Sequence, residues 1–238
     1  MLTPLDREVL VTTSLDPDIA GGTPEPPIAR RTLHDEVTTR VRDMIIEGRI
    51  QPGSRVNETQ LGQTLGVSRT PLREALKTLA SEGLLELVPQ RGAVVREFSL
   101  QDVAEILEVT KALEQLAGRL ACERGSGAQI AEVRRLHDEM MRYYKRRERL
   151  AYYKLNHAIH AAIVAMAGNP TLSEMHATLQ ARSKQIRYVG NSAPEKWAGA
   201  VSDHEQIVDA LERRDGDRLA AILGAHMDNT LVRVRDMF

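Results

Sequence analysis

Apolar residues recur at helical spacing in three segments near the start of the chain. A Pro-Gly turn at 50–55 follows the first segment, and a tight turn at 66–68 separates the second from the third. Two short helices joined by a glycine-containing turn are typical of a helix-turn-helix. The predicted helices are 33–47, which Gly48 ends, 59–65, which Asn57 or Glu58 precedes, and 67–82.

The third helix has two different faces. The apolar arc should pack against Val41, Ile45 and Leu61, and the polar arc should lie on the surface. Ser68 or Thr70 caps its N-terminus, and with Thr70 as the cap Pro71 would be the first helical residue. The apolar arc holds Leu72, Leu76 and Leu79, and the polar arc holds Arg69, Thr70, Arg73 and Lys77.

Two strand-like runs follow this helix. Residues 84–88 and 93–98 are rich in apolar and β-branched residues, and Pro89-Gln90-Arg91-Gly92 joins them. This pattern predicts a small β-hairpin wing. The first 29 residues are dominated by proline, glycine and acidic residues without periodicity, which predicts a mobile arm.

From Ser99 onward every segment is predicted to be helical. Ser99 and Asp102 have the spacing of a capping box. Helices separated by short loops favour an antiparallel bundle. The predicted bundle helices are 100–123, 126–148, 150–167, 170–190, 195–214 and 216–236. The chain is therefore predicted to be mainly α, with an arm at 1–29, a winged helix-turn-helix at 30–98 and a helical domain at 99–238.

Composition narrows the classes of function. The net charge of −1 means that any nucleic-acid site is a local patch, and the 3% aromatic content argues against stacking on single strands. The single cysteine fits a reducing cytosol. No segment resembles a signal peptide or a membrane span, so we expect a cytoplasmic protein.

The segment PGSRVNETQLGQTLGVSRTPLREALKTLASEGLLELVPQRGAVV resembles the winged helix of GntR-type bacterial transcription regulators. The resemblance implies that the recognition helix contacts double-stranded operator DNA and that the wing tip lies near the minor groove. Arg69 and Arg73 would read base edges or phosphates, and Arg55 and Lys77 would support them on the DNA backbone. The predicted DNA-binding residues are Arg55, Ser68, Arg69, Thr70, Arg73, Lys77, Arg91 and Gly92.

The helical region is similar to the effector domain of the FadR subfamily, called the FCD domain, in its shorter six-helix form. The markers are LEQLAGRLACERG, NHAIHAAIVAMAGNPTL and DHEQIVDALERRDGDRLAAILGAHM. Asn156 and His160 lie one turn apart on one helix, and His204 and His226 lie on two later helices, so three helices could enclose a divalent ion. The resemblance supports this, because the positions match the family's metal ligands. Zinc is the default expectation, with nickel or manganese as alternatives.

Two positions depart from the family pattern. The first ligand is commonly aspartate, whereas Asn156 offers only a neutral amide oxygen. Many relatives have an arginine at Thr110 that helps to hold a carboxylate. Arg182 and Arg187 are alternative partners for an anionic effector. His34, His137 and His176 are expected to be surface or hydrogen-bonded histidines.

The sequence thus predicts a dimeric, ligand-responsive transcription regulator, most simply a repressor. A two-fold dimer would read a pseudo-palindromic operator, and a small organic acid would bind the bundle directly or through the metal. A metal-dependent enzyme using the three-histidine site is one alternative, although no motif marks a general base and no catalytic residue is predicted. A sequence-neutral DNA-binding protein is the other.

Overall fold

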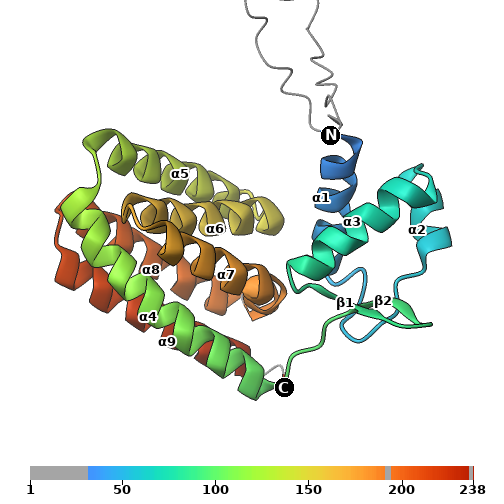
Figure 1. Ribbon diagram of the computed structural model, residues 1–238. Helices are drawn as coiled ribbons and strands as arrows, with labels where there is room; N and C mark the ends of the chain where they lie inside the picture. Colours follow the sequence, from blue (N-terminus) through green and yellow to red (C-terminus); the bar gives the residue numbers. More distant parts are fainter. Residues whose placement is uncertain (1–31, 191–193, 236–237) are drawn as a thin grey trace, which may run out of the picture. The chain divides into compact units, whose positions relative to one another are not determined.

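The computed structural model describes residues 32–190, 194–235 and 238 (Figure 1). The predicted arm at 1–29 lies outside these residues. Within them the chain is mainly helical, with one two-stranded sheet. None of the described helices combines the length and the apolar character needed to cross a membrane.

The first group of elements is a winged helix-turn-helix, as predicted. A capping box between Thr32 and Asp35 starts its first helix, and the Asn57 side chain accepts a hydrogen bond from the Gln60 backbone at the start of the second. Gly66 ends the second helix with a φ of 67°, which glycine adopts without strain. The elements are α1 (Leu33–Ile46), α2 (Glu58–Leu65), α3 (Arg69–Ser81), β1 (Leu85–Val88) and β2 (Gly92–Val95).

The predicted apolar arc of α3 is confirmed. Leu72, Leu76 and Leu79 are each at most 2% exposed and belong to one core cluster. The same cluster contains Val41 and Ile45 of α1 and Leu61 of α2. The polar arc of α3 consequently faces away from this core.

The start of α3 decides between the two caps. Ser68 occupies the N-cap position with extended backbone, although its side chain makes no capping hydrogen bond. Arg69 is the first helical residue and Pro71 the third, so capping by Thr70 is wrong. Proline is tolerated here because the first-turn N–H groups have no partner within the helix.

The wing is shorter than predicted. β1 pairs antiparallel with β2 from Leu85↔Val95 to Val88↔Gly92. One further hydrogen bond joins Arg96 to Leu84, and there the ladder stops. The predicted extension of the second strand to Phe98 is wrong. The chain before Leu84 belongs to the end of α3, so residues 97 and 98 have no strand to pair with.

The second group of elements is the predicted helical bundle. α4 and α9 run antiparallel, since Lys111 pairs with Asp228 and Arg119 pairs with Asp217 further along α4. The two helices approach closely at Gly118, where a Cβ atom would lie 2.9 Å from a Leu223 methyl carbon. The bundle consists of α4 (Leu100–Arg124), α5 (Gly127–Lys145), α6 (Arg149–Met166), α7 (Pro170–Gly190), α8 (Pro194–Glu212) and α9 (Gly216–Arg235).

Candidate DNA-contact surface and metal centre

The polar arc of α3 is open to solvent. Ser68, Arg69, Thr70, Arg73 and Lys77 are all exposed. Ser68, Arg69 and Thr70 lie at the N-terminal end of α3, where free backbone N–H groups and the helix dipole favour anions. Arg73 and Lys77 follow one and two turns further along the same face. The arrangement suits contact with phosphates and base edges.

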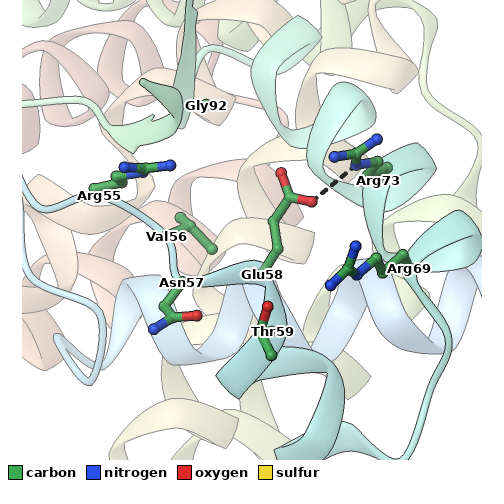
Figure 2. A pocket seen from close by; sticks show the side chains of 8 residues that line it. All are labelled: Arg55, Val56, Asn57, Glu58, Thr59, Arg69, Arg73 and Gly92. Atoms are coloured by element: carbon green, nitrogen blue, oxygen red, sulfur yellow. Dashed lines mark hydrogen bonds and ion pairs between the residues drawn. The ribbon is translucent and has the colours of Figure 1, made fainter. Parts of the chain in front are cut away.

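Two of these residues, Arg69 and Arg73, line an open hollow of about 540 Å³ (Figure 2). Arg55 approaches it from the segment before α2, Arg69 and Arg73 from α3, and Gly92 from the wing. The hollow therefore gathers three guanidinium groups from two parts of the winged helix, the segment before α2 and the start of α3. Its lining residues are Arg55, Val56, Asn57, Glu58, Thr59, Arg69, Arg73 and Gly92.

Glu58 places one carboxylate among these arginines. Its Oε2 accepts a hydrogen bond from Arg73 Nε at 2.8 Å (Figure 2). The hydrogen bond and the charge of Glu58 raise the pKa of Arg73. Sequence reasoning considered Glu58 only as a possible helix start, because an acidic residue in a first turn has an ordinary explanation in the helix dipole.

The other predicted DNA-contact residues, Ser68, Thr70, Lys77 and Arg91, are not among those that line this hollow. Arg91 is exposed at the wing tip, and Gly92 beside it has a φ of 77°. Lys77 is exposed and pairs with Glu74 at 2.7 Å on the same helix. Their roles in binding DNA stay predictions.

Three of the predicted metal ligands meet inside the bundle. One ligand atom from each of His160, His204 and His226 lies within 4.8 Å of the other two. The three ring centroids are 5.0 to 5.2 Å apart, and each residue is at most 2% exposed. Zinc–nitrogen bonds of about 2.1 Å hold two ligand atoms at most ~4.2 Å apart, so the three imidazoles need at most a small shift to close around one ion. The donor set therefore fits a divalent ion.

The fourth predicted ligand, Asn156, is placed one turn before His160 on α6. It is 5% exposed, so its amide is also inside the bundle. An amide oxygen is a neutral donor. With three imidazoles it makes a ligand set that carries no charge.

Two carboxylates contact the histidines from behind. Glu114 Oε2 on α4 lies 2.8 Å from His160 Nδ1, and Asp203 Oδ2 on α8 lies 3.0 Å from His226 Nδ1. Burial raises the pKa of Glu114, but the charge of His160 and hydrogen bonds from His160 and His176 outweigh it and hold that pKa well below its usual range. Burial likewise raises the pKa of Asp203, whereas the His226 hydrogen bond and the neighbouring Arg233 lower it overall.

These two acids were missed by sequence reasoning. Glu114 lies in the LEQLAGRLACERG marker and Asp203 directly precedes His204, yet neither has a recognisable ligand spacing. His176, expected to be on the surface or hydrogen-bonded, is 2% exposed and satisfied, with its Nε2 3.0 Å from Glu114 Oε1. His157, next to the ligands in sequence, contacts the Gln180 side chain instead.

The three residues predicted to bind an effector are not seen to form a common site in the described part of the chain. Thr110 is 1% exposed and its hydroxyl donates to the Ile106 carbonyl within α4. Arg182 is half-buried on α7. Arg187 belongs to α7, but its side chain lies outside the described part of the chain. Their part in binding an effector stays a prediction.

A winged helix-turn-helix with an exposed recognition helix, followed by an all-helical domain with a buried polar cluster, defines a class of DNA-binding regulators. Two family models match in the same order. The model for bacterial regulatory proteins of the gntR family matches residues 33–95, and the FCD domain model matches residues 105–229. The chain belongs to the gntR family of transcription regulators, in its FadR subfamily with an FCD domain.

Relatives agree with this assignment. The chain is 32% identical over 189 residues to the Nta operon transcriptional regulator of Aminobacter aminovorans, covering 77% of this chain and 86% of that protein. It is 30% identical over 203 residues to the "Probable D-xylose utilization operon transcriptional repressor" of Paenarthrobacter nicotinovorans, covering 84% and 89%. The solved structure of E. coli McbR/YncC has the same fold, with a TM-score of 0.75 at 23% identity over 87% of this chain and 99% of that one. The chain is accordingly a regulator and not an enzyme.

Proposed function

We propose that this protein is a ligand-responsive repressor that binds a pseudo-palindromic operator as a homodimer. A divalent ion, with zinc as the first candidate, and a small organic acid would bind inside the helical bundle. An effector alters DNA binding only if it binds one arrangement of the dimer more tightly than another. Repression is favoured because the Paenarthrobacter relative is named as a repressor.

The observation that carries the proposal is the arginine-lined hollow. Arg55 comes from the segment before α2 and Arg69 and Arg73 from α3, and the three border one space with Gly92 of the wing. Arginine pairs well with guanine edges and with phosphate oxygens, because its planar fork makes two hydrogen bonds at once. A protein near neutral overall needs such a local concentration of positive charge to bind DNA.

The face of α4 that is turned to solvent supports a dimer. Val109 is 46% exposed and Leu116 is 44% exposed, and Ala112 between them is exposed as well. These positions are three, four and seven residues apart, so they form one apolar stripe on the helix. A second copy of the same stripe would cover it with two-fold symmetry.

The proposed binding of a pseudo-palindromic operator is tested by selecting bound duplexes from a random pool. The purified full-length chain should enrich one motif with two inverted halves, because a two-fold dimer presents α3 twice. Enrichment of an unsymmetrical motif would contradict the dimer. Failure to enrich any motif would favour the sequence-neutral alternative.

The buried histidine cluster supports the metal part. Thermal unfolding of chelator-treated protein, with and without added zinc, checks it, because a ligand that binds only the folded chain raises the melting temperature. Organic acids should raise it further in the presence of zinc, since open coordination positions accept a carboxylate. Unchanged melting with zinc would remove the metal from the proposal.

A further inference from the structure

The proposed metal centre has no negative charge among its ligands. Asn156 and the three histidines are all neutral donors, whereas a divalent ion brings a charge of +2 into a site where each of these residues is at most 5% exposed. Burying an uncompensated charge is costly, so a stable centre needs negative charge close by.

Glu114 is placed to provide that charge. It is 1% exposed, and its two carboxylate oxygens contact His160 Nδ1 at 2.8 Å and His176 Nε2 at 3.0 Å. Because a carboxylate beside Nδ1 accepts a hydrogen bond from the Nδ1–H group, it selects the tautomer whose Nε2 lone pair is free for an ion. His176 holds the other oxygen and fixes the carboxylate in place.

Asp203 orients a second imidazole in the same way, but it contributes less net negative charge to the site. Its Oδ2 lies 3.0 Å from His226 Nδ1, but Arg233 Nη1 lies 3.3 Å from the same oxygen and offsets part of the negative charge. Glu114 contacts no arginine or lysine in the hydrogen bonds that the structure records for it. Glu114 is therefore the stronger source of compensation.

We propose that Glu114, supported by Asp203, neutralises the metal from outside the ligand shell and orients the histidines that bind it. The two carboxylates oppose the charge of a divalent ion, although Arg233 offsets part of the share that Asp203 provides. Glu114 is thus a positioning residue whose charge sets the metal affinity of a neutral ligand set. This inference rests on the metal site of the proposed function.

The inference is tested by measuring zinc affinity. Full-length protein purified without an affinity tag competes for zinc with a chromophoric chelator. Glu114→Gln keeps the shape of the side chain and removes its charge, and should weaken zinc binding by roughly 10- to 100-fold. Glu108→Gln is the matched control, because Glu108 lies on the same helix and is exposed. It removes the same charge and should leave zinc affinity unchanged.

A rescue experiment separates charge from packing. Adding Asn156→Asp to Glu114→Gln moves a negative charge into the ligand shell, and zinc affinity should return to within a few-fold of wild type. Weak binding that Asn156→Asp does not rescue would show a merely structural role for Glu114 and would overturn the proposal. Equal zinc affinity in wild type and Glu114→Gln would also overturn it.

The existence of the metal site and the role of Glu114 at that site are refuted by different results. Wild-type protein that binds no zinc would refute the metal site itself. If circular dichroism shows that Glu114→Gln does not fold, Asp203→Asn decides: it should weaken zinc binding by less than Glu114→Gln is expected to, and Asn156→Asp should restore it. Unchanged affinity in Asp203→Asn would then count against the carboxylate role.

Discussion

The winged helix and the helical bundle place their polar groups in opposite ways. In the winged helix the core cluster around Leu72 and Leu76 is apolar, and the arginines of the hollow lie on the surface. In the bundle a carboxylate and several imidazoles are buried between the helices, among them Glu114 and His204. The first region therefore presents its polar groups to solvent, whereas the second keeps polar groups inside its core.

The difference has energetic consequences. The ion pair between Arg73 and Glu58 is accessible to water, so Arg73 can exchange Glu58 for DNA at small cost. The contact between His160 and Glu114 is shielded from water on both sides, and removing the carboxylate takes a buried hydrogen-bond partner from both His160 and His176. Substitutions in the bundle should therefore have larger effects than substitutions on the recognition surface.

The largest effect is expected for His204→Ala. Removing one of three imidazoles should abolish stoichiometric zinc binding, as measured by elemental analysis after dialysis. DNA binding by the ligand-free protein should persist, because the winged helix folds around its own core. His137→Ala is the control, since His137 is equally buried in the bundle but lies beside Glu205 and not in the cluster. Equal zinc content in wild type and His204→Ala would show that these histidines are ordinary bundle residues.

The next largest effect concerns the apolar core of the winged helix. Leu76 is 2% exposed, and Leu76→Ala should destabilise this region by roughly 2–5 kcal/mol through lost packing and the cavity left behind. Because Trp197 is the single tryptophan and lies in α8, its fluorescence reports on the bundle. In Leu76→Ala, part of the helical circular dichroism should be lost at a denaturant concentration below the one at which Trp197 fluorescence changes. Leu87→Ala, at a position 54% exposed, should unfold like wild type.

A smaller effect is expected on the recognition surface. Arg73→Ala should weaken operator binding by roughly 5- to 150-fold if Arg73 makes a paired contact with one base, and should relax specificity at that base. Lys77→Ala should weaken operator and scrambled duplex alike, because a lysine on a phosphate carries no sequence information. Titrations with both duplexes at one salt concentration distinguish these outcomes. Unchanged operator affinity in both Arg73→Ala and Arg69→Ala would remove α3 from its assigned role.

The helices and the two faces of α3 could be predicted from the sequence, but the end of the second strand could not. Periodic apolar positions identified the helices of both regions, and the faces of α3 followed because one of its faces is apolar and the other charged. The end of the second strand at Val95 was missed, because a strand ends where its partner ends and the partner's length is not written in the strand itself.

Within the bundle, single positions could be predicted but their partners could not. His160, His204 and His226 were grouped by resemblance, and the structure brings them together. Glu114 lies 46 residues from His160 in sequence, and a lone glutamate in a long helix is typical of a solvated surface. Only the packing of α4 against α6 shows that this carboxylate is buried and paired.

The smallest expected effect, and the one of opposite sign, concerns Glu58. Its carboxylate lies among three arginines and 2.8 Å from Arg73 Nε. It repels phosphates in general while holding Arg73 in one orientation, so it should favour the correct sequence over any other. Glu58→Gln should tighten binding to scrambled duplex a few-fold, whereas operator affinity should gain less.

The ratio of operator to scrambled affinity is therefore the quantity to measure, at two salt concentrations, since phosphate contacts weaken as salt rises. Glu36→Gln provides the control, because Glu36 forms a similar ion pair with Arg40 on α1 and lies outside the hollow. It should leave the ratio unchanged. A ratio that Glu58→Gln also leaves unchanged would mean that the Glu58–Arg73 pair is an ordinary surface contact, and that the arginines alone determine specificity.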